Sequence, residues 1–353
     1  MFYLLDENLN FMSPIESYQS AIWTTRYYKP GDFELYLPAT TEILNLIKRD
    51  CYLVRDDDFT QAMIIENIQI TTSIEDGNFL TITGKCLKSI LDRRIILKQT
   101  TVNGNVEKCI RRLITENAIT PTMSARKIDN LILGAELGIT DTMNSQYTGD
   151  NLGEVVSKIC INYGLGYDIL LDLDKKQFIF ILFKGSDRSY NQNKNPFIVF
   201  SNEFDNLLST NYINNNENYK NVAIVAGEGE GLDRKIFTVG TATGLKRYEL
   251  FVDSRDSSTK EDEPITEDEY NAILAEKGKE ALTETIITES IEGELEPHYT
   301  YQFNRDYFLG DIVEVVNEYG LTMQPQITEV IESEDDNGKN VVVTFETKIE
   351  KEV

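Results

Sequence analysis

Short runs that alternate apolar and polar residues, separated by turn residues, recur along this chain and constrain its fold most. Residues 62–72 and 79–84 form one such pair, joined around residues 75–78, and residues 167–173 and 177–183 form another. Alternation with period two places one face of a strand in a core, and turn residues between two such runs favour a hairpin. The chain is therefore predicted to be rich in antiparallel β-structure.

Helical periodicity is confined to a few stretches. Residues 86–117 are predicted to be helical in two pieces. Residues 151–163 form a further amphipathic segment, which Asn151 would cap and Gly164 would end. An acidic stretch at about 256–285 has a helical pattern as well, and we expect it either to pack on one side or to act as a docking arm.

These patterns predict three domains in an α+β, β-rich chain. Residues 1–100 and residues 196–353 are rich in strands, and the second segment contains the acidic helical insertion. Residues 101–195 combine the predicted helices with a hairpin and form a small α+β domain. With 353 residues the chain is long enough for several cores. The boundaries are approximate, because one domain can be built from discontinuous segments.

A glycine-rich stretch at residues 227–231 (GEGEG) follows an apolar run, as a nucleotide-binding loop would. Its third glycine falls one position too early, and residues 235–239 have a strand pattern where the nucleotide-binding motif needs a helix. Glu228 and Glu230 would also face phosphates with like charge. The stretch is therefore predicted to connect strand 221–226 to strand 235–239, and no cofactor is expected.

Charge and reactive residues exclude several classes of protein. The formal charge is −25, with 59 acidic and 34 basic residues, which excludes a broad DNA-binding surface. The four cysteines are far apart and the single histidine, His298, has no ligand partner beside it, so no metal site is expected. Free, buried thiols are the simpler interpretation of the cysteines. No apolar run reaches the roughly 20 residues of a membrane helix, and the N-terminus lacks the features of a signal peptide.

Four stretches carry a more specific signal. They are residues 23–38, residues 170–189, residues 199–212 with 219–231, and residues 306–330. Together and in this order they resemble the siphophage tail proteins that form the baseplate hub or tail-tip ring. The resemblance extends over residues 1–347. The residues that carry it are Trp23, Arg26, Tyr27, Gly31, Phe33, Leu35, Pro38, Gly185, Asp187, Arg188, Ser189, Asp306, Tyr307, Gly310 and Asp311.

The resemblance implies a hub-like fold, similar to the central hub of contractile-phage baseplates. Such a chain carries two tube-like antiparallel β-barrel domains, and three chains close a ring that continues the tail tube. The implied partners are two further copies, a distal tail protein ring, the tape-measure protein, and tail fibre or receptor-binding tip proteins. DNA would pass in transit without being bound, and no membrane insertion is expected. The implied location is the virion tail tip or baseplate, with assembly in the host cytoplasm.

The motif residues are expected to have structural roles, and none is assigned to catalysis. Trp23, Tyr27, Phe33 and Leu35 are expected to pack in a core. Arg26 and Asp32 would form a local ion pair. Gly185 and Gly310 would occupy turns that need positive φ. Asp187 and Arg188 lie in a polar loop, which would be either a subunit contact or a simple turn.

Three functions remain open at this stage. The first is a structural, non-enzymatic hub protein. The second is a tail-associated cell-wall hydrolase or peptidase, whose acidic pair would not be locatable among 59 carboxylates. The third is a component that binds a host receptor or carbohydrate, using its many aromatic residues. Ring assembly, clearing of cell-wall substrate, and saturable binding to host cells would distinguish them.

Overall fold

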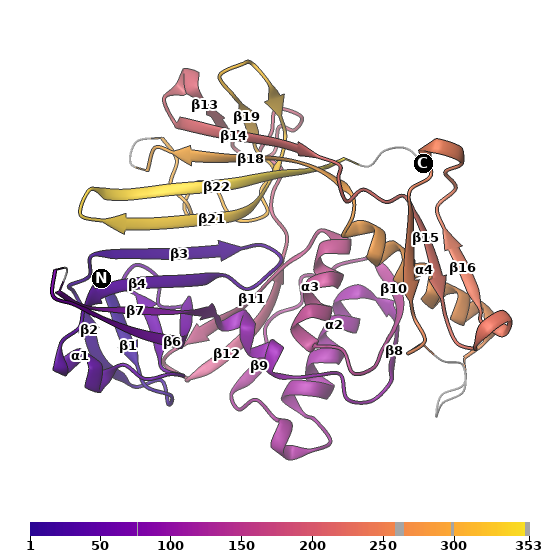
Figure 1. Cartoon of the computed structure of the whole chain (residues 1–353), viewed down its shortest axis with the longest axis horizontal. Helices are drawn as coiled ribbons and strands as arrows, with labels where there is room; N and C mark the ends of the chain where they lie inside the picture. The colour runs from indigo at the N-terminus through magenta and orange to yellow at the C-terminus, as the bar shows by residue number, and fades with distance from the viewer. Residues whose placement is uncertain (76, 258–264, 298–299, 350–353) are drawn as a thin grey trace.

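The computed structural model (Figure 1) describes residues 1–75, 77–257, 265–297 and 300–349. His298 and residues 258–264 of the acidic stretch lie outside the described residues. Within the described part, no helix is long and apolar enough to cross a membrane. The four cysteines are free and buried, as expected from their scattered positions.

One eleven-stranded antiparallel sheet dominates the fold, and its strands come from both ends of the chain (Figure 1). Its order is β14-β18-β22-β21-β3-β4-β7-β6-β5-β1-β2. The strands are β1 (Phe2–Leu5), β2 (Phe11–Ile15), β3 (Ser20–Arg26), β4 (Asp32–Pro38), β5 (Tyr52–Arg55), β6 (Ala62–Ser73), β7 (Gly77–Cys86), β14 (Leu207–Asn215), β18 (Ile287–Leu295), β21 (Gln326–Asp335) and β22 (Gly338–Ile349). A short helix, α1 (Thr41–Leu46), connects β4 to β5.

The two ends of the chain are joined by strands β3 and β21. Their pairing runs from Arg26 opposite Glu329 to Ser20 opposite Asp335, and so links residues about 300 positions apart. These eleven strands therefore form one open sheet with β2 and β14 as its edges, and two closed barrels are not seen among the described residues. The expectation of a β-rich antiparallel fold is confirmed. The sheet combines strands from the first and last predicted domains, while the exact domain boundaries stay predictions.

One face of the sheet carries two hydrophobic cores. The N-terminal core contains Trp23, Phe33 and Leu35, and the C-terminal core contains Val330 and Phe345. Residues that lie opposite each other in paired strands point to the same face. Val330 lies opposite Thr25, and Thr25 shares its face of β3 with Trp23, so both cores lie on one face of the sheet. The opposite face is covered only in part.

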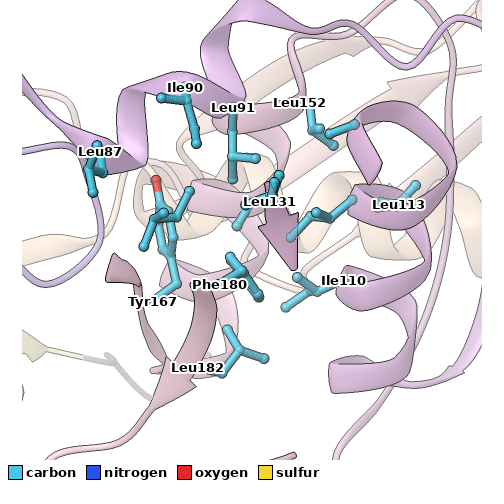
Figure 2. Packing of buried hydrophobic residues seen from close by; sticks show 14 of the residues in the cluster. Leu87, Ile90, Leu91, Ile110, Leu113, Leu131, Leu152, Tyr167, Phe180 and Leu182 are labelled. Carbon is cyan, nitrogen blue, oxygen red and sulfur yellow. The ribbon is translucent and has the colours of Figure 1, made fainter. Parts of the chain in front are cut away.

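The middle of the chain forms a compact α+β unit that covers this opposite face at β1, β5 and the start of β6. Leu5, Val54 and Ile64 of those strands belong to its core. Figure 2 shows Leu87 and Leu91, Ile110 and Leu113, Tyr167 and Phe180 converging in this core. Its elements are the 3-10 helix η1 (Leu87–Arg93), β8 (Thr100–Asn105), α2 (Val106–Ile114), the π-helical turn η2 (Thr115–Ile119), η3 (Ser124–Arg126), β9 (Leu131–Leu133), β10 (Thr142–Tyr147), α3 (Leu152–Tyr163), β11 (Gly166–Asp172) and β12 (Gln177–Phe183).

The local predictions for this unit hold well. The Asn151 side chain accepts from the backbone of Glu154, and α3 ends at Gly164, whose φ is +63°. The β11–β12 hairpin is antiparallel as expected. The first helical piece predicted within residues 86–117 is a 3-10 helix, and a strand precedes α2, so only the second piece is an α-helix.

A second unit is inserted between the paired strands β14 and β18. It contains β15 (Val222–Ala226), η5 (Gly231–Asp233), β16 (Ile236–Val239), η6 (Gly244–Lys246), β17 (Glu249–Asp253) and α4 (Glu267–Thr283). The predicted connection of strand 221–226 to strand 235–239 is confirmed, because β15 and β16 are antiparallel neighbours. Thr266 and Glu269 form a capping box at the start of α4.

Helix α4 lies between the small sheet β16-β15-β17 and the α+β unit. Tyr270 and Leu274 pack toward Ala223 and Val225 of the small sheet. On the other side, Tyr147 donates to Glu280 at 2.9 Å and Tyr163 donates to Glu276 at 2.6 Å. The acidic stretch therefore contains a helix that is packed on two sides.

The remaining short strands close the C-terminal core. They are β13 (Val199–Ser201), β19 (Glu314–Val316) and β20 (Thr322–Met323), with η4 (Asn202–Phe204) after β13. β13 and β19 are parallel, and β19 and β20 are antiparallel. They bring residues 198–201 and 313–316 together beside the large sheet.

Candidate assembly site

Tyr27 lies where the N-terminal strands, the α+β unit and the C-terminal segment meet. Its side chain has 0% exposure, and burial raises the pKa of its hydroxyl to about 12. The hydroxyl donates to the Gly164 carbonyl at 3.2 Å and accepts from the Gly185 amide at 3.4 Å. The Tyr27 backbone amide donates to the Thr328 carbonyl at 2.9 Å. One residue therefore contacts all three parts, and we call its surroundings the three-way junction.

Two glycines make room for the Tyr27 ring, and a third lets two backbones meet beside it. A Cβ atom at Gly166 or at Gly310 would lie 2.3 Å from the ring. A Cβ at Gly185 would lie 1.9 Å from the carbonyl carbon of Gly310. Gly310 has a φ of +86°, as predicted. The same prediction is wrong for Gly185, which has no positive φ and is needed instead because two backbones approach closely there.

Asp311 anchors the α+β unit to the C-terminal segment. One of its carboxylate oxygens accepts from the Ser186 amide at 2.7 Å, and the other pairs with Nε of Arg188 at 2.6 Å. That second oxygen also accepts from the Phe308 amide at 3.0 Å. The Asp311 side chain is 2% exposed and that of Arg188 is 14% exposed. A buried carboxylate is stable when it is paired and hydrogen-bonded, as Asp311 is here by Arg188 and two backbone amides.

The backbone of residues 186–188 runs beside Ile312. The Ile312 amide donates to the Ser186 carbonyl at 3.0 Å, and the Arg188 amide donates to the Ile312 carbonyl at 2.7 Å. Asp187 accepts from the backbone and hydroxyl of Ser189 at 2.9 and 2.7 Å. The polar loop is therefore tied to the chain's own C-terminal segment.

Arg26 and Lys88 hold the loop that contains Tyr27. Arg26 forms ion pairs with Asp32, at 2.5 Å, and with Glu329, and the predicted Arg26–Asp32 pair is confirmed. Lys88 is 3% exposed and donates to the Arg26 carbonyl at 2.5 Å. Sequence reasoning missed Lys88, although a lysine inside the apolar run 86–91 was a visible signal.

The other motif residues lie away from the junction. Trp23, Phe33 and Leu35 belong to the N-terminal core. Gly31 approaches the Thr24 carbonyl so closely that a Cβ would lie 2.0 Å from it. Pro38 is exposed at the end of β4.

Tyr307 and Asp306 belong to the C-terminal segment. The Tyr307 ring packs edge-on to Phe200 at 5.3 Å in the C-terminal core, and burial raises its pKa. Asp306 pairs with the neighbouring Arg305 at 2.7 Å and accepts from the Gln302 amide at 2.8 Å. Both residues are therefore used in packing and loop formation.

The polar side chains of the three-way junction are used to hold the three parts of the chain together. Its carboxylates pair with arginines or accept from backbone amides, and its tyrosine hydroxyl is hydrogen-bonded. In the part of the chain that the structure describes, no three His, Cys, Asp or Glu side chains are grouped as a metal ion would need. The aspartate run at 56–58 makes a turn, in which Asp57 pairs with Arg55 and Asp58 accepts from Thr60.

A large antiparallel sheet shared by both chain ends and joined by a buried junction defines a β-rich fold. Solved structures of phage tail proteins share this fold. A tail protein from Neisseria meningitidis MC58 has a TM-score of 0.60 at 14% identity, over 98% of this chain and 96% of that one. The 43 kDa tail protein of prophage MuSo2 from Shewanella oneidensis has a TM-score of 0.58 at 12% identity, over 98% and 97%.

A third solved structure agrees with these two. The prophage tail protein gp18 from Listeria monocytogenes EGD-e has a TM-score of 0.55 at 10% identity, over 99% of this chain and 95% of that one. A search of curated proteins found no match. The chain belongs to the family of Siphovirus ReqiPepy6 Gp37-like proteins, whose model matches residues 1–345. The predicted resemblance to siphophage tail proteins is thereby confirmed, and the family places the chain in the virion tail.

Proposed function

We propose that this chain is the hub protein of a siphophage tail tip, a non-enzymatic ring of three copies that continues the tail tube and lets DNA pass. The observation that carries this proposal is the uncovered face of the eleven-stranded sheet. From β14 to β7 this face lies opposite the two cores of the large sheet and spans both ends of the chain.

The chemistry of the uncovered face suits a channel wall. Most side chains that the register places on it are exposed or half-buried and are small and polar or acidic, although Thr24 is buried and Arg26 and Lys85 are basic. They include Ser209, Asn211, Ser290, Glu292, Glu294, Thr344, Glu346, Ser333, Glu34, Tyr36, Thr81 and Thr83. DNA phosphates bind where lysines and arginines neutralise them. A face of this composition would let DNA slide with little adhesion, and three copies would add their acidic charge.

The open edges of the sheet support a closed ring. Strands β2 and β14 are both unpaired on their outer side within the described chain. Neither FMSPI (11–15) nor LLSTNYINN (207–215) contains a charged residue. Free, uncharged edges invite pairing with another chain, and a ring removes them by pairing each copy with its neighbours.

The position of the three-way junction explains how one chain would hold two parts of a tube wall. Tyr27, Asp311 and Arg188 tie the N-terminal strands, the C-terminal segment and the α+β unit together. The partners we propose are a distal tail protein ring, the tape-measure protein, and fibre or receptor-binding tip proteins. The proposed place of action is the tail tip, with assembly in the host cytoplasm.

The test is the mass of the purified chain by light scattering over a range of concentrations, with negative-stain images of the same fractions. A trimer of 40.3 kDa chains has a mass of about 121 kDa and should show a ring with an open centre. A chain that stays monomeric both alone and with purified distal tail protein would refute the proposal. Clearing of cell-wall substrate that an acid-to-amide substitution abolishes would replace it with the hydrolase alternative.

A further inference from the structure

Positive charge is concentrated in one part of this acidic protein. Residues 85–127, which run from the end of β7 to the residue after η3, contain ten basic and three acidic residues, a net charge of +7. Because the whole chain carries −25, the other residues together carry −32. Such an asymmetry is typical of a chain that binds a partner of opposite charge.

Two loops of the α+β unit bring these charges together. Residues 93–98 (RRIILK) and residues 123–127 (MSARK) contain five basic and no acidic residues. Nε of Arg94 donates to the carbonyl of Arg126 at 2.5 Å, and Arg126 donates in turn to the carbonyl of Ile95. We call the surface that these two stretches form the basic patch. Figure 1 shows the chain between α2 and β9, which includes the second stretch, projecting at the lower edge of the α+β unit.

Three cations of the basic patch have no carboxylate partner among the residues that the structure describes. Arg94 and Arg126 donate to backbone carbonyls, and the Lys98 side chain is exposed. Burial and the neighbouring charges of Arg126 and Arg93 lower the pKa of Arg94. Like charges are therefore held close together, and a bound anion would relieve their repulsion.

The other two cations of the basic patch are only weakly neutralised. Arg93 pairs with Asp50 at 3.2 Å, and Lys127 pairs with Asp129 at 3.6 Å. All four side chains are exposed, and exposed ion pairs contribute little free energy. A carboxylate of a partner can therefore take the place of Asp50 or Asp129 at little cost.

Apolar side chains are interspersed among these cations. Ile95 is 44% exposed, Leu97 is 45% exposed and Met123 is 56% exposed. Arginine and methionine are both enriched in protein interfaces, whereas phosphate groups of a nucleic acid offer nothing for the apolar side chains to pack on. The composition of the basic patch therefore favours a protein partner.

The charge of the remaining surface limits the size of the acidic partner. A DNA duplex or an anionic membrane carries its charge well beyond the patch and would be repelled by the −32 charges outside residues 85–127. Salt screens exposed charges over about 8 Å at physiological ionic strength. A short acidic segment that covers only the patch therefore escapes most of this repulsion.

We propose that the basic patch binds a short acidic segment of another protein. The carboxylates of that segment meet the five cations, and its apolar side chains pack on the three exposed apolar residues of the patch. This binding site goes beyond the proposed hub function and does not depend on a ring.

The experiment measures binding of a labelled synthetic peptide of alternating glutamate and leucine to the full chain by fluorescence anisotropy. We expect saturable binding that weakens as salt is added. Lys98→Glu combined with Lys127→Glu should weaken binding about tenfold or more, because two attractive charges become repulsive. Both lysines are exposed, so this double variant should unfold at the same temperature as the unmodified chain, which circular dichroism checks.

Lys175→Glu combined with Lys194→Glu is the matched control. Lys175 forms an exposed pair with Asp172 at 3.0 Å and Lys194 is exposed, so each resembles one of the two lysines of the patch. The control changes the net charge by the same amount and should leave binding unchanged. Equal weakening in the two double variants would show that binding follows the net charge of the chain, and would overturn the assignment to the basic patch.

Two further probes decide the kind of partner. A peptide of alternating glutamate and serine should bind more weakly, and equal binding would overturn the contact with the apolar side chains. A DNA duplex of similar length should also bind more weakly than the glutamate–leucine peptide. A duplex that binds as tightly would overturn the assignment to a protein segment. A lack of saturable peptide binding would overturn the inference and leave the hub proposal, which the mass measurement tests, standing.

Discussion

Arg188 and Asp311 form a largely buried ion pair, with Nε and Oδ2 2.6 Å apart, that joins the end of the α+β unit to the C-terminal segment. The two residues are 123 positions apart in the sequence. They bring together two stretches that the sequence marks only as separate family-like motifs. The pair therefore shows why these motifs occur together in one chain.

Breaking this pair should destabilise the fold strongly. Asp311→Asn leaves Arg188 largely buried without a counter-charge and deprives the Ser186 and Phe308 amides of a carboxylate acceptor. We expect a loss of about 3 kcal/mol in the free energy of unfolding, measured by urea denaturation. Arg305→Ala breaks the exposed Arg305–Asp306 pair and should cost less than about 1 kcal/mol. Equal losses in the two variants would contradict the assigned role of Asp311.

The fit of Gly310 against Tyr27 predicts a large effect from one methyl group. Gly310→Ala has both an unfavourable φ of +86° and a Cβ that would lie 2.3 Å from the Tyr27 ring. Gly138→Ala is the matched control, because its φ is +82° and no atom lies within 4 Å of its added Cβ. The control should lose about 1–2 kcal/mol from backbone strain alone, and Gly310→Ala should lose clearly more. Equal thermal stabilities of the two variants would show that the junction tolerates a shift of the ring.

The docking of α4 should depend on pH through Glu280. Burial raises the pKa of its carboxyl above the ordinary value of 4.5, although Lys277 and the Tyr147 hydroxyl oppose the shift and Glu276 adds to it. The folded state thus favours the protonated form, so this group's contribution to stability falls as the pH rises from 4.5 through the raised pKa.

Replacing Glu280 by glutamine tests this sign. Glutamine keeps an acceptor for Tyr147 and cannot ionise, so Glu280→Gln should unfold at a higher temperature than the unmodified chain at pH 7. The difference should shrink as the pH is lowered toward 4.5, since the carboxyl is then protonated. Thermal unfolding of both proteins across this range is the measurement. A difference that grows on acidification would reverse the predicted direction of the pKa shift.

The inserted unit should be removable. Strands β14 and β18 remain paired up to Asn215 opposite Thr288, so a short turn that replaces residues 216–286 would close the hairpin directly. We expect the shortened chain to fold with its large sheet intact and to unfold at a somewhat lower temperature, because Tyr147 and Tyr163 lose their contacts with α4. Circular dichroism and thermal unfolding check this. Loss of a cooperative transition would mean that the large sheet depends on the insertion.

The sequence by itself determined the local elements of this protein. Period-two alternation located the β6–β7 and β11–β12 hairpins, and the cap signals at Asn151 and Gly164 bounded α3. The strand pattern after the GEGEG stretch excluded a nucleotide-binding helix. These features depend on backbone preferences and on contacts between neighbours in the chain, which a single sequence displays directly.

Only the tertiary structure decided how these elements are joined. The pairing of β3 with β21, the insertion between β14 and β18, and the meeting of Tyr27 with Gly166, Gly185 and Gly310 all connect distant segments. Alternation shows that a strand has a buried face, but it does not show which strand lies beside it. The partner of a strand is chosen by the match of register and core volume between segments far apart in the sequence. Gly185 is an example at a single position: the sequence suggested a turn with positive φ, whereas the structure shows that a glycine is needed there because the backbone of Gly310 lies so close.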